Sequence, residues 1–305
     1  MTRRCGFAAV IGAPNAGKST LVNRLVGTKI AIVSPKVQTT RMPVRGVAIR
    51  GETQIVLVDT PGIFRPKRRL DRAMVTSAWS GAEDADAIVL IADAPELVVN
   101  PDGLAARDTA AIVGRLKENG RKAALVLNKI DGMKRAELLP LIERLRDDAV
   151  FEAVFVVSAL KGDAVEDVAA WCAGKMPEGP WLFPEDQAGD IASRLLASEI
   201  TREKLYLRLH DELPYASTVE TEKWEERKDG SVRIDQIIFV QREGQKAIVL
   251  GKGGASIKKI GEMARAELEE IFGRRVHLFL YVKVDENWAE KREHYREMGL
   301  EFPEE

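Results

Sequence analysis

A glycine-rich stretch near the N-terminus has the residue types and the spacing of a phosphate-binding loop. Residues 12–20 read Gly-Ala-Pro-Asn-Ala-Gly-Lys-Ser-Thr, between an apolar run at 7–11 and an apolar-periodic segment at 21–26. Glycines let backbone N–H groups point at phosphate oxygens, and the positive end of the following helix adds to the same attraction. Lys18 is placed to reach the β- and γ-phosphates, and the Ser19 hydroxyl is placed to ligate Mg²⁺. The predicted nucleotide contacts in this loop are Asn15, Ala16, Gly17, Lys18, Ser19 and Thr20.

A second group of candidate residues follows this loop. Residues 34–43 are polar, include two prolines and have no clear period, so they are predicted to form a long loop. A strand-like run at 54–58 ends in Asp-Thr-Pro-Gly at 59–62. A carboxylate at the end of a buried strand suits a contact to a magnesium-bound water, and a glycine N–H can approach a γ-phosphate closely. We therefore expect Asp59 and Gly62 to face the phosphates.

The string Asn-Lys-Ile-Asp at 128–131 supplies groups that can read a base. An aspartate accepts from both N1–H and the 2-amino group of guanine, a donor pair that adenine lacks. Asp131 is thus the predicted guanine reader, Asn128 would tie this loop to the phosphate loop, and the Lys129 stem would stack on the ring. The residues after the next strand would offer a backbone N–H to the guanine 6-oxo group, and they are Ser158, Ala159 and Leu160.

Alternating strand and helix patterns would bring these residues together. A predicted hairpin covers 44–50 and 54–58, and further strands are predicted at 87–92, 123–127 and 153–157. Helical patterns lie between and after them, at 75–82, 104–119, 135–147 and 165–175. Such alternation predicts an α/β fold with a doubly wound, mostly parallel sheet, in which ligands bind at the carboxyl ends of the strands. Each candidate residue lies at such an end.

Composition narrows the classes of protein that remain. The 305 residues suggest two domains. No apolar run approaches the ~20 residues that span a bilayer, and the N-terminus leads directly into a strand rather than a signal peptide. Two cysteines indicate no disulfide framework, so we expect a cytoplasmic protein with small, buried Cys5 and Cys172. The net charge of −1 neither favours nor excludes nucleic acid, and nothing demands more than a monomer.

A proline- and glycine-rich stretch marks the predicted domain boundary. It separates a nucleotide-binding domain at 1–178 from a second domain at 191–305, with a linker at 179–190. The second domain opens with a helical pattern at 191–209. Two strands follow at 216–226 and 232–241 around an Asp-Gly turn.

The second domain contains its own glycine-rich loop, Gly-Lys-Gly-Gly at 251–254. It lies between an apolar segment at 246–250 and an amphipathic helix that runs to Ile271, before a last strand at 276–284. G-x-x-G in this setting is the signature of a KH domain, whose loop clamps the backbone of about four nucleotides. Residues 245–284 hold eight Lys and Arg against four acids, which supports RNA binding only locally. The predicted RNA contacts are Gly251, Lys252, Gly253, Gly254, Lys258 and Lys259.

The ordered motifs G-x-x-x-x-G-K-S, Thr40, D-T-P-G, N-K-I-D and S-A-L resemble those of the translation-factor-related GTPases. The strings at 12–20 and 38–41, with the second domain, resemble the Era-like family of bacterial GTPases over nearly the whole chain. The resemblance implies a P-loop GTPase domain followed by a smaller α+β domain, a type II KH domain. It implies that Thr40 closes on Mg²⁺ and the γ-phosphate, with Thr39 as the other assignment. Catalysis would then rest on Lys18, Thr40 and Gly62, and magnesium on Ser19, Thr40 and Asp59.

Two positions bear on the rate of hydrolysis. Ras-like enzymes place a water-orienting glutamine directly after the D-x-x-G glycine, but Ile63 stands here and has no hydrogen-bonding group. We therefore expect slow intrinsic hydrolysis. In related GTPases without that glutamine, an asparagine at the position of Asn15 is associated with a potassium ion. Potassium stimulation is a hypothesis, and the alternative is that Asn15 only braces the loop.

The sequence as a whole predicts a GTP-driven, RNA-binding switch. By resemblance, its RNA is the 3′ end of 16S rRNA and its role is maturation of the small (30S) ribosomal subunit. One alternative is a membrane- or division-linked signalling GTPase whose second domain binds a protein or lipid surface, with peripheral membrane association. A metabolic kinase is a third reading, which N-K-I-D disfavours. Trp288 in the C-terminal region could stack on a base or pack in the core.

Overall fold

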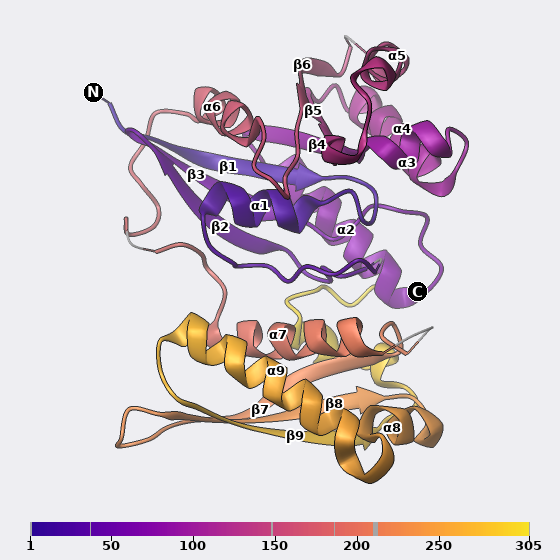
Figure 1. Ribbon diagram of the computed structural model, residues 1–305. Coiled ribbons are helices and arrows are strands. Elements are labelled where there is room, and N and C mark those ends of the chain that lie inside the picture. The colour runs from indigo at the N-terminus through magenta and orange to yellow at the C-terminus, as the bar shows by residue number, and fades with distance from the viewer. Residues whose placement is uncertain (1, 37, 148, 186, 210–212, 305) are drawn as a thin grey trace. The chain divides into compact units, whose positions relative to one another are not determined.

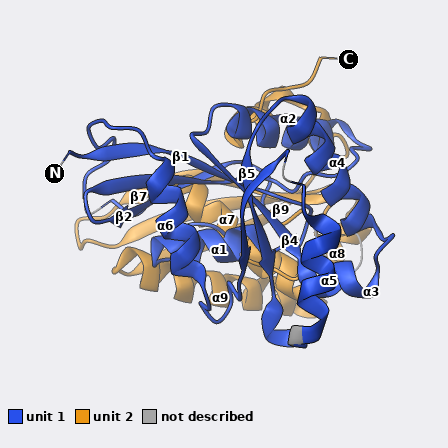
Figure 2. Cartoon of the chain, turned by 90° about the horizontal axis from the view of Figure 1, so that it is seen from above, with its two compact units in different colours: residues 1–31, 40–190 blue, residues 32–39, 191–305 orange. Residues whose placement is uncertain are grey.

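The computed structural model describes residues 2–36, 38–147, 149–185, 187–209 and 213–304. Its backbone contacts divide the chain into two compact units, coloured separately in Figure 2. One unit contains residues 1–31 and 40–190, and the other contains residues 32–39 and 191–305. The two-domain prediction placed 32–39 in the first domain. The structure instead groups this short segment with the C-terminal part of the chain, and it groups the predicted linker with the first unit.

The first unit is built on a six-stranded sheet with the order β2-β3-β1-β4-β5-β6 (Figure 1). Only β2 runs antiparallel to its neighbour, so the sheet is mostly parallel, as predicted. Strands β3, β4 and β5 read as continuous apolar runs because helices cover both faces of a parallel sheet. The strands are β1 (Arg4–Ile11), β2 (Val44–Arg50), β3 (Thr53–Asp59), β4 (Ala87–Asp93), β5 (Ala123–Asn128) and β6 (Phe151–Val156).

The crossover helices supply the apolar faces that bury this sheet. Helices α2, α3, α4 and α5 share one core cluster with alternate residues of the central strands, while α1 and α6 pack against β2 and β3. The helices are α1 (Lys18–Val26), α2 (Arg69–Glu83), α3 (Ala94–Val99), α4 (Leu104–Glu118), the 3₁₀ turn η1 (Ile130–Gly132), α5 (Arg135–Leu145) and α6 (Val165–Lys175). The sequence patterns did not indicate α3. Cys5 and Cys172 are both buried and unpaired, as expected.

The stretch predicted as a linker packs along the edge of this sheet. The N–H of Val47 in β2 donates to the carbonyl of Ala188 at 2.9 Å, and the N–H of Asp190 donates to the carbonyl of Arg45 at 3.1 Å. The fully buried Gln54 amide donates to the carbonyl of Phe183 at 2.8 Å. Residues 179–190 therefore belong to the first unit in structural terms.

The second unit has a three-stranded sheet with the order β7-β8-β9. Strands β7 (Ser217–Glu226) and β8 (Val232–Val240) form the predicted hairpin, and β9 (Val276–Val284) pairs with β8 in parallel. A parallel partner requires a crossover, which consists of α8 (Glu243–Leu250), the 3₁₀ turn η2 (Lys252–Gly254) and α9 (Ala255–Phe272). The remaining elements are α7 (Ser193–Arg208), η3 (Trp288–Glu290) and α10 (Arg292–Glu297).

Two apolar clusters hold this unit together. One of them joins α7, α9 and the sheet through Leu196, Ile200, Ala264 and Leu268, and it also includes Ile32 from the short segment 32–39.

None of the described helices is long and apolar enough to cross a membrane.

Candidate nucleotide and RNA sites

The phosphate loop connects β1 to α1, as the sequence predicted. Lys18 opens α1 and is only 6% exposed. Its ammonium group donates to the carbonyls of Gly12 at 3.1 Å and Ala13 at 2.9 Å, so the side chain lies back across the loop. Burial lowers the pKa of Lys18 to about 8, although the charge of Asp59 acts in the opposite direction. A buried cation of this kind favours an anionic ligand.

Asn128 braces the phosphate loop against the base-reading loop. Its amide donates to the carbonyl of Ala16 at 2.9 Å, and its oxygen accepts the N–H of Ala159 at 2.9 Å. Gly17 has φ +99°, and a Cβ there would lie 2.2 Å from the Asn128 amide nitrogen. The glycine is therefore required for two reasons, its left-handed backbone and the close approach of Asn128.

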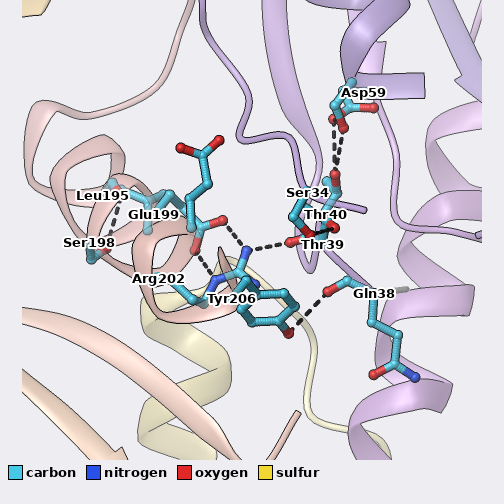
Figure 3. Close-up of polar contacts among 12 residues, drawn as sticks. Ser34, Gln38, Thr39, Thr40, Asp59, Leu195, Ser198, Glu199, Arg202 and Tyr206 are labelled. Carbon is cyan, nitrogen blue, oxygen red and sulfur yellow. Dashed lines mark hydrogen bonds and ion pairs between the residues drawn. The ribbon is translucent and has the colours of Figure 1, made fainter. Parts of the chain in front are cut away.

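Three oxygen-bearing side chains meet beside Lys18. The Ser19 hydroxyl lies 2.7 Å from one carboxylate oxygen of Asp59 and 2.8 Å from the hydroxyl of Thr40. The Thr40 hydroxyl in turn donates to Asp59 at 3.1 Å (Figure 3). Ser19 lies in the first turn of α1, Asp59 ends β3, and Thr40 lies in the loop before β2. The structure thus gathers the three residues predicted to hold magnesium.

The electrostatics of this cluster fit a hard divalent cation. Asp59 is fully buried, and burial raises the pKa of its carboxyl to about 6, against the weaker opposing effects of Ser19, Lys18 and Thr40. Its second oxygen, Oδ1, is buried without a hydrogen-bond partner among the described residues. Hydroxyl and carboxylate oxygens are the ligands that Mg²⁺ takes from a protein. These residues therefore fit a magnesium ion.

The two adjacent threonines, which the sequence left ambiguous, point their hydroxyls in different directions. The Thr39 hydroxyl lies 2.7 Å from that of Ser34 and donates to the carbonyl of Lys36 at 2.7 Å. Only the Thr40 hydroxyl contacts Ser19 and Asp59. The geometry favours Thr40 as the residue that approaches a metal ion.

The D-x-x-G turn lies against the phosphate loop. A Cβ on Gly62 would lie 3.0 Å from the Cα of Pro14, which leaves little room for a larger residue. The next N–H, that of Ile63, donates to the carbonyl of Gly12 at 3.0 Å. The Ile63 side chain is 6% exposed and packs in the core cluster that contains Trp79. The position that carries glutamine in Ras-like enzymes is therefore occupied by a core side chain.

The loop predicted to read the base is organised around Asp131. The Ser158 hydroxyl donates to the Asp131 carboxylate at 2.7 Å, and this bond is the main reason that the pKa of Asp131 is held below its ordinary value. Asp131 is itself exposed, so its second oxygen can face a ligand. Leu160 is 69% exposed, so its side chain is not packed in the core.

Two residues that the motifs did not indicate support the base-reading loops. Arg24 of α1 donates to the carbonyls of Ala159 and Leu160, and Asp93 at the end of β4 pairs with the Lys129 ammonium group. Asp93 could have been suspected because it ends a strand of the parallel sheet. Arg24 carries no such signal, since its role depends on where α1 meets the loop after β6.

Asn15 lies in the phosphate loop, and Thr20 lies in the first turn of α1. Asn15 is exposed and has φ +62°.

The Gly-Lys-Gly-Gly loop forms a separate and much more open site in the second unit. Gly251, Gly253 and Gly254 have φ of +71°, +61° and +79°, and the loop leads directly into α9. Lys252 is exposed, and so are Lys258 and Lys259 in the first turns of α9. Lys259 also pairs with Glu262 at 3.5 Å. The three lysines and a helix N-terminus together suit a phosphate chain.

Trp288, one of the open assignments, belongs to the core. It is 1% exposed, and its ring N–H donates to the carbonyl of Ala216 at 3.0 Å. Base stacking requires an exposed ring face, so of the two alternatives the structure supports packing.

Comparison with known proteins finds relatives of both parts of the chain. Residues 7–129 match the family model described as a 50S ribosome-binding GTPase, and residues 212–289 match the KH domain. The GTPase Era of Caulobacter vibrioides is 60% identical over 98% of this chain and 97% of its own length. The GTPase Era of Brucella suis biovar 1 is 59% identical over 98% of this chain and 94% of its own.

Solved structures give the same result. Aquifex aeolicus Era bound to GDP and AlF₄⁻ superposes with a TM-score of 0.89 at 39% identity, covering 97% of this chain and 99% of the other. A complex of Era with MgGDPNP and nucleotides 1506–1542 of 16S ribosomal RNA gives the same score, identity and coverage. Fold and sites therefore define a P-loop GTPase that carries a KH domain. Within that class, the chain belongs to the Era family of GTPases.

Proposed function

We propose that this GTPase is a nucleotide-controlled switch that binds the 3′ end of 16S rRNA through its KH domain and assists assembly of the small ribosomal subunit. The observation that carries the proposal is the presence, in one chain, of a braced nucleotide site and an exposed Gly-Lys-Gly-Gly loop flanked by lysines. The complex of a 39% identical Era with MgGDPNP and 16S rRNA nucleotides supports it. On this basis the protein acts in the cytoplasm, where ribosomal subunits are assembled, and as a monomer.

In the nucleotide site, Lys18 and the backbone of residues 15–20 hold the phosphates, and the N–H of Gly62 senses the γ-phosphate. Ser19, Thr40 and Asp59 hold Mg²⁺, which when bound neutralises charge on the β- and γ-phosphates. Asp131 reads the guanine edge while Ser158 fixes its carboxylate, and Lys129 covers the ring. Asn128 keeps the two loops in register. The Ala159 and Leu160 backbone closes the base site.

The environment of Ile63 makes slow intrinsic hydrolysis the expected behaviour. A side chain that packs in the core cannot orient the attacking water, and side chains with this task contribute substantially to the rates of related enzymes. The carbonyl-bearing side chain of Asn15 is exposed at the phosphate loop, where it can help to hold a potassium ion that supplies positive charge beside the phosphates.

The experiment is RNA binding by the purified full-length protein loaded with GDP or with a non-hydrolysable GTP analogue. The probe is a 16S rRNA 3′-end oligonucleotide, with a scrambled sequence beside it. We expect tighter binding of the true sequence in the GTP form. Gly253→Asp should abolish it, because a carboxylate would stand in the phosphate-binding loop.

Gly230→Asp is the matched control. Gly230 also has a positive φ, lies in the β7–β8 turn of the same unit and has nothing within 4 Å of its Cβ position. Equal effects of the two substitutions would contradict a role for the Gly-Lys-Gly-Gly loop. Binding that ignores both nucleotide and sequence would contradict the rRNA switch and leave the GTPase assignment intact. Co-sedimentation with anionic vesicles would then test the alternative of a KH unit that binds a membrane surface.

A further inference from the structure

Helix α7 has a buried face that is largely polar, which the apolar spacing in the sequence did not reveal. Its fully or almost fully buried residues include Arg202, Glu203 and Lys204 at 1%, 2% and 7% exposure. Burying charged side chains is unfavourable unless each is paired, and an amphipathic helix normally buries apolar residues there. Lys204 pairs with Glu203 at 2.6 Å and with Glu267 of α9, and Arg202 pairs with Glu199 one turn earlier. The charges of this face are therefore balanced within the unit, and their remaining hydrogen-bonding groups can hold a further segment.

The segment that they contact is 32–39, which belongs to the same compact unit as α7. Ile32 enters the apolar cluster of that unit. The N–H of Val33 donates to the Glu203 carboxylate at 2.8 Å, and Lys36 donates to the carbonyl of Leu209 at the end of α7. The Tyr206 hydroxyl donates to the carbonyl of Gln38 at 3.4 Å. The segment is thus held along α7 by backbone groups of Val33 and Gln38 and by the side chain of Lys36.

Arg202 makes the last of these contacts and the most consequential one. Its Nη2 donates to the carbonyl of Thr39, and its Nε donates to the Glu199 carboxylate at 2.8 Å (Figure 3). The guanidinium also lies 5.1 Å from the centre of the Tyr206 ring. Burial opposes the charged form, but Glu199 outweighs it and holds the pKa of Arg202 above its ordinary value. The contact to Thr39 is therefore made by a permanently charged and oriented donor.

The carbonyl that Arg202 holds is part of the peptide group that leads into Thr40. A peptide group is planar, so fixing the Thr39 oxygen also restrains the nitrogen and the Cα of Thr40. The Thr40 hydroxyl is the one that lies 2.8 Å from Ser19 and 3.1 Å from Asp59. The residue that Arg202 contacts, Thr39, is therefore directly followed in the chain by a member of the predicted magnesium cluster, Thr40.

We propose that Arg202 is a positioning residue of the GTPase site, which presents Thr40 to Mg²⁺ and the γ-phosphate by holding the Thr39 carbonyl. The inference rests on the proposed role of Thr40 as a magnesium ligand. A residue of the KH-containing part of the chain thereby contributes to the affinity for GTP. The contribution is specific to the triphosphate, because contacts to the γ-phosphate and Mg²⁺ are what order such loops.

The test compares the affinities of the full-length protein for fluorescent GDP and for a fluorescent non-hydrolysable GTP analogue at several Mg²⁺ concentrations. The main variant is the double substitution Glu199→Gln with Arg202→Met. It removes both charges of the ion pair and nearly keeps the side-chain volume, a change that proteins often tolerate. We expect affinity for the GTP analogue to fall about tenfold, within the usual range of coupling between sites. The Mg²⁺ concentration needed for tight binding should rise, and affinity for GDP should stay within about twofold of wild type.

Three further variants make the result decisive. Arg202→Lys keeps a charge beside Glu199 and tests the role of the forked donor if the double variant folds poorly. It should lose affinity only for the GTP analogue. Arg208→Ala removes an exposed arginine from the same helix and should change nothing. Thr40→Ala should lower affinity for the GTP analogue at least as much as the double variant.

Two outcomes would overturn the inference. If Thr40→Ala selectively weakens the GTP analogue but the folded Arg202 variants do not, the magnesium role of Thr40 stands and the positioning role of Arg202 fails. If Thr40→Ala also leaves the ratio of the two affinities unchanged, the proposed role of Thr40 fails and the inference fails with it. Circular dichroism and a thermal melt on each variant separate both outcomes from unfolding.

Discussion

The molecule contains two glycine-rich loops of similar chemistry, one for each site, and they differ most in what surrounds them. Each loop carries a lysine and leads into a helix N-terminus. In the first, Lys18 is 6% exposed and Gly17 is pressed against Asn128. In the second, Lys252 is exposed, and a Cβ on Gly253 would meet nothing within 4 Å.

The difference follows from the ligand that each loop serves. A small nucleotide must be enclosed, because charge and hydrogen bonds discriminate strongly only where water is excluded. A polynucleotide passes across the surface, so its loop must remain open and bind through screened charges and backbone shape. Two loops of similar sequence are thus expected to bind their ligands with different strength, because one is buried and the other is exposed.

The largest expected effect comes from a methyl group added to each loop. Gly17→Ala should lower GDP affinity about a hundredfold, through about 1–2 kcal/mol of left-handed backbone strain and roughly 1 kcal/mol for the lost Asn128 bond. Gly254→Ala carries only the strain, so RNA affinity should fall at most about tenfold. Titration calorimetry would measure the GDP affinity, and filter binding would measure the RNA affinity. Equal losses would contradict the view that surroundings separate the loops.

The next effect concerns pH and is specific to the buried loop. Since burial lowers the pKa of Lys18 to about 8, the free protein loses this proton above pH 8, while bound phosphates favour the protonated form. The complex therefore holds more protons, and GDP affinity should fall about tenfold per pH unit above 8. Lys18→Arg is the control because arginine stays charged, so its affinity should not show this slope. Parallel slopes would exclude Lys18 as the titrating group.

The third prediction concerns salt and is specific to the open loop. Each lysine that contacts a phosphate of single-stranded RNA adds about 0.7 to the slope of log affinity against log salt. Lys252→Ala should therefore reduce the slope by about 0.7 and weaken binding severalfold at low salt. Lys228→Ala, in the turn between β7 and β8, should leave the slope unchanged. A slope unaffected by Lys252→Ala would remove this lysine from the RNA contact.

The smallest expected effect tests potassium at the first loop. Hydrolysis should be severalfold faster in KCl than in NaCl at matched ionic strength, since a cation beside the phosphates stabilises developing charge. Asn15→Gly should remove the difference without straining the loop, because glycine accepts the φ of +62° that Asn15 adopts. Equal rates of the unmodified protein in the two salts would mean that Asn15 only braces the loop.

Much of the fold and of the nucleotide site could be predicted because the information is local. The buried strands read as apolar runs, and the residues that follow β1, β3, β5 and β6 meet because carboxyl ends of parallel strands share one edge. The spacing from Gly12 to Ser19 reflects the backbone geometry of a single phosphate-binding loop. The order of elements in the second unit was likewise visible in its pattern, whereas the parallel pairing of β9 with β8 was shown only by the structure.

Other features depend on contacts between segments far apart in the chain, and no local pattern encodes them. Arg24 and Asp93 support the base-reading loops only because folding brings them there. Trp288 is buried in the core, where the carbonyl of Ala216 accepts its ring N–H. The roles of Thr39 and Thr40 differ because their hydroxyls find different neighbours.

The sequence by itself was enough to predict the chemistry: which loop should bind phosphate, which carboxylate should read guanine and which loop should face RNA. Only the tertiary structure decided that residues 32–39 associate with α7, across more than 150 intervening residues. The physical reason is that motifs record short-range geometry, whereas the partner of a buried charge such as Arg202 is set by the packing of the whole unit.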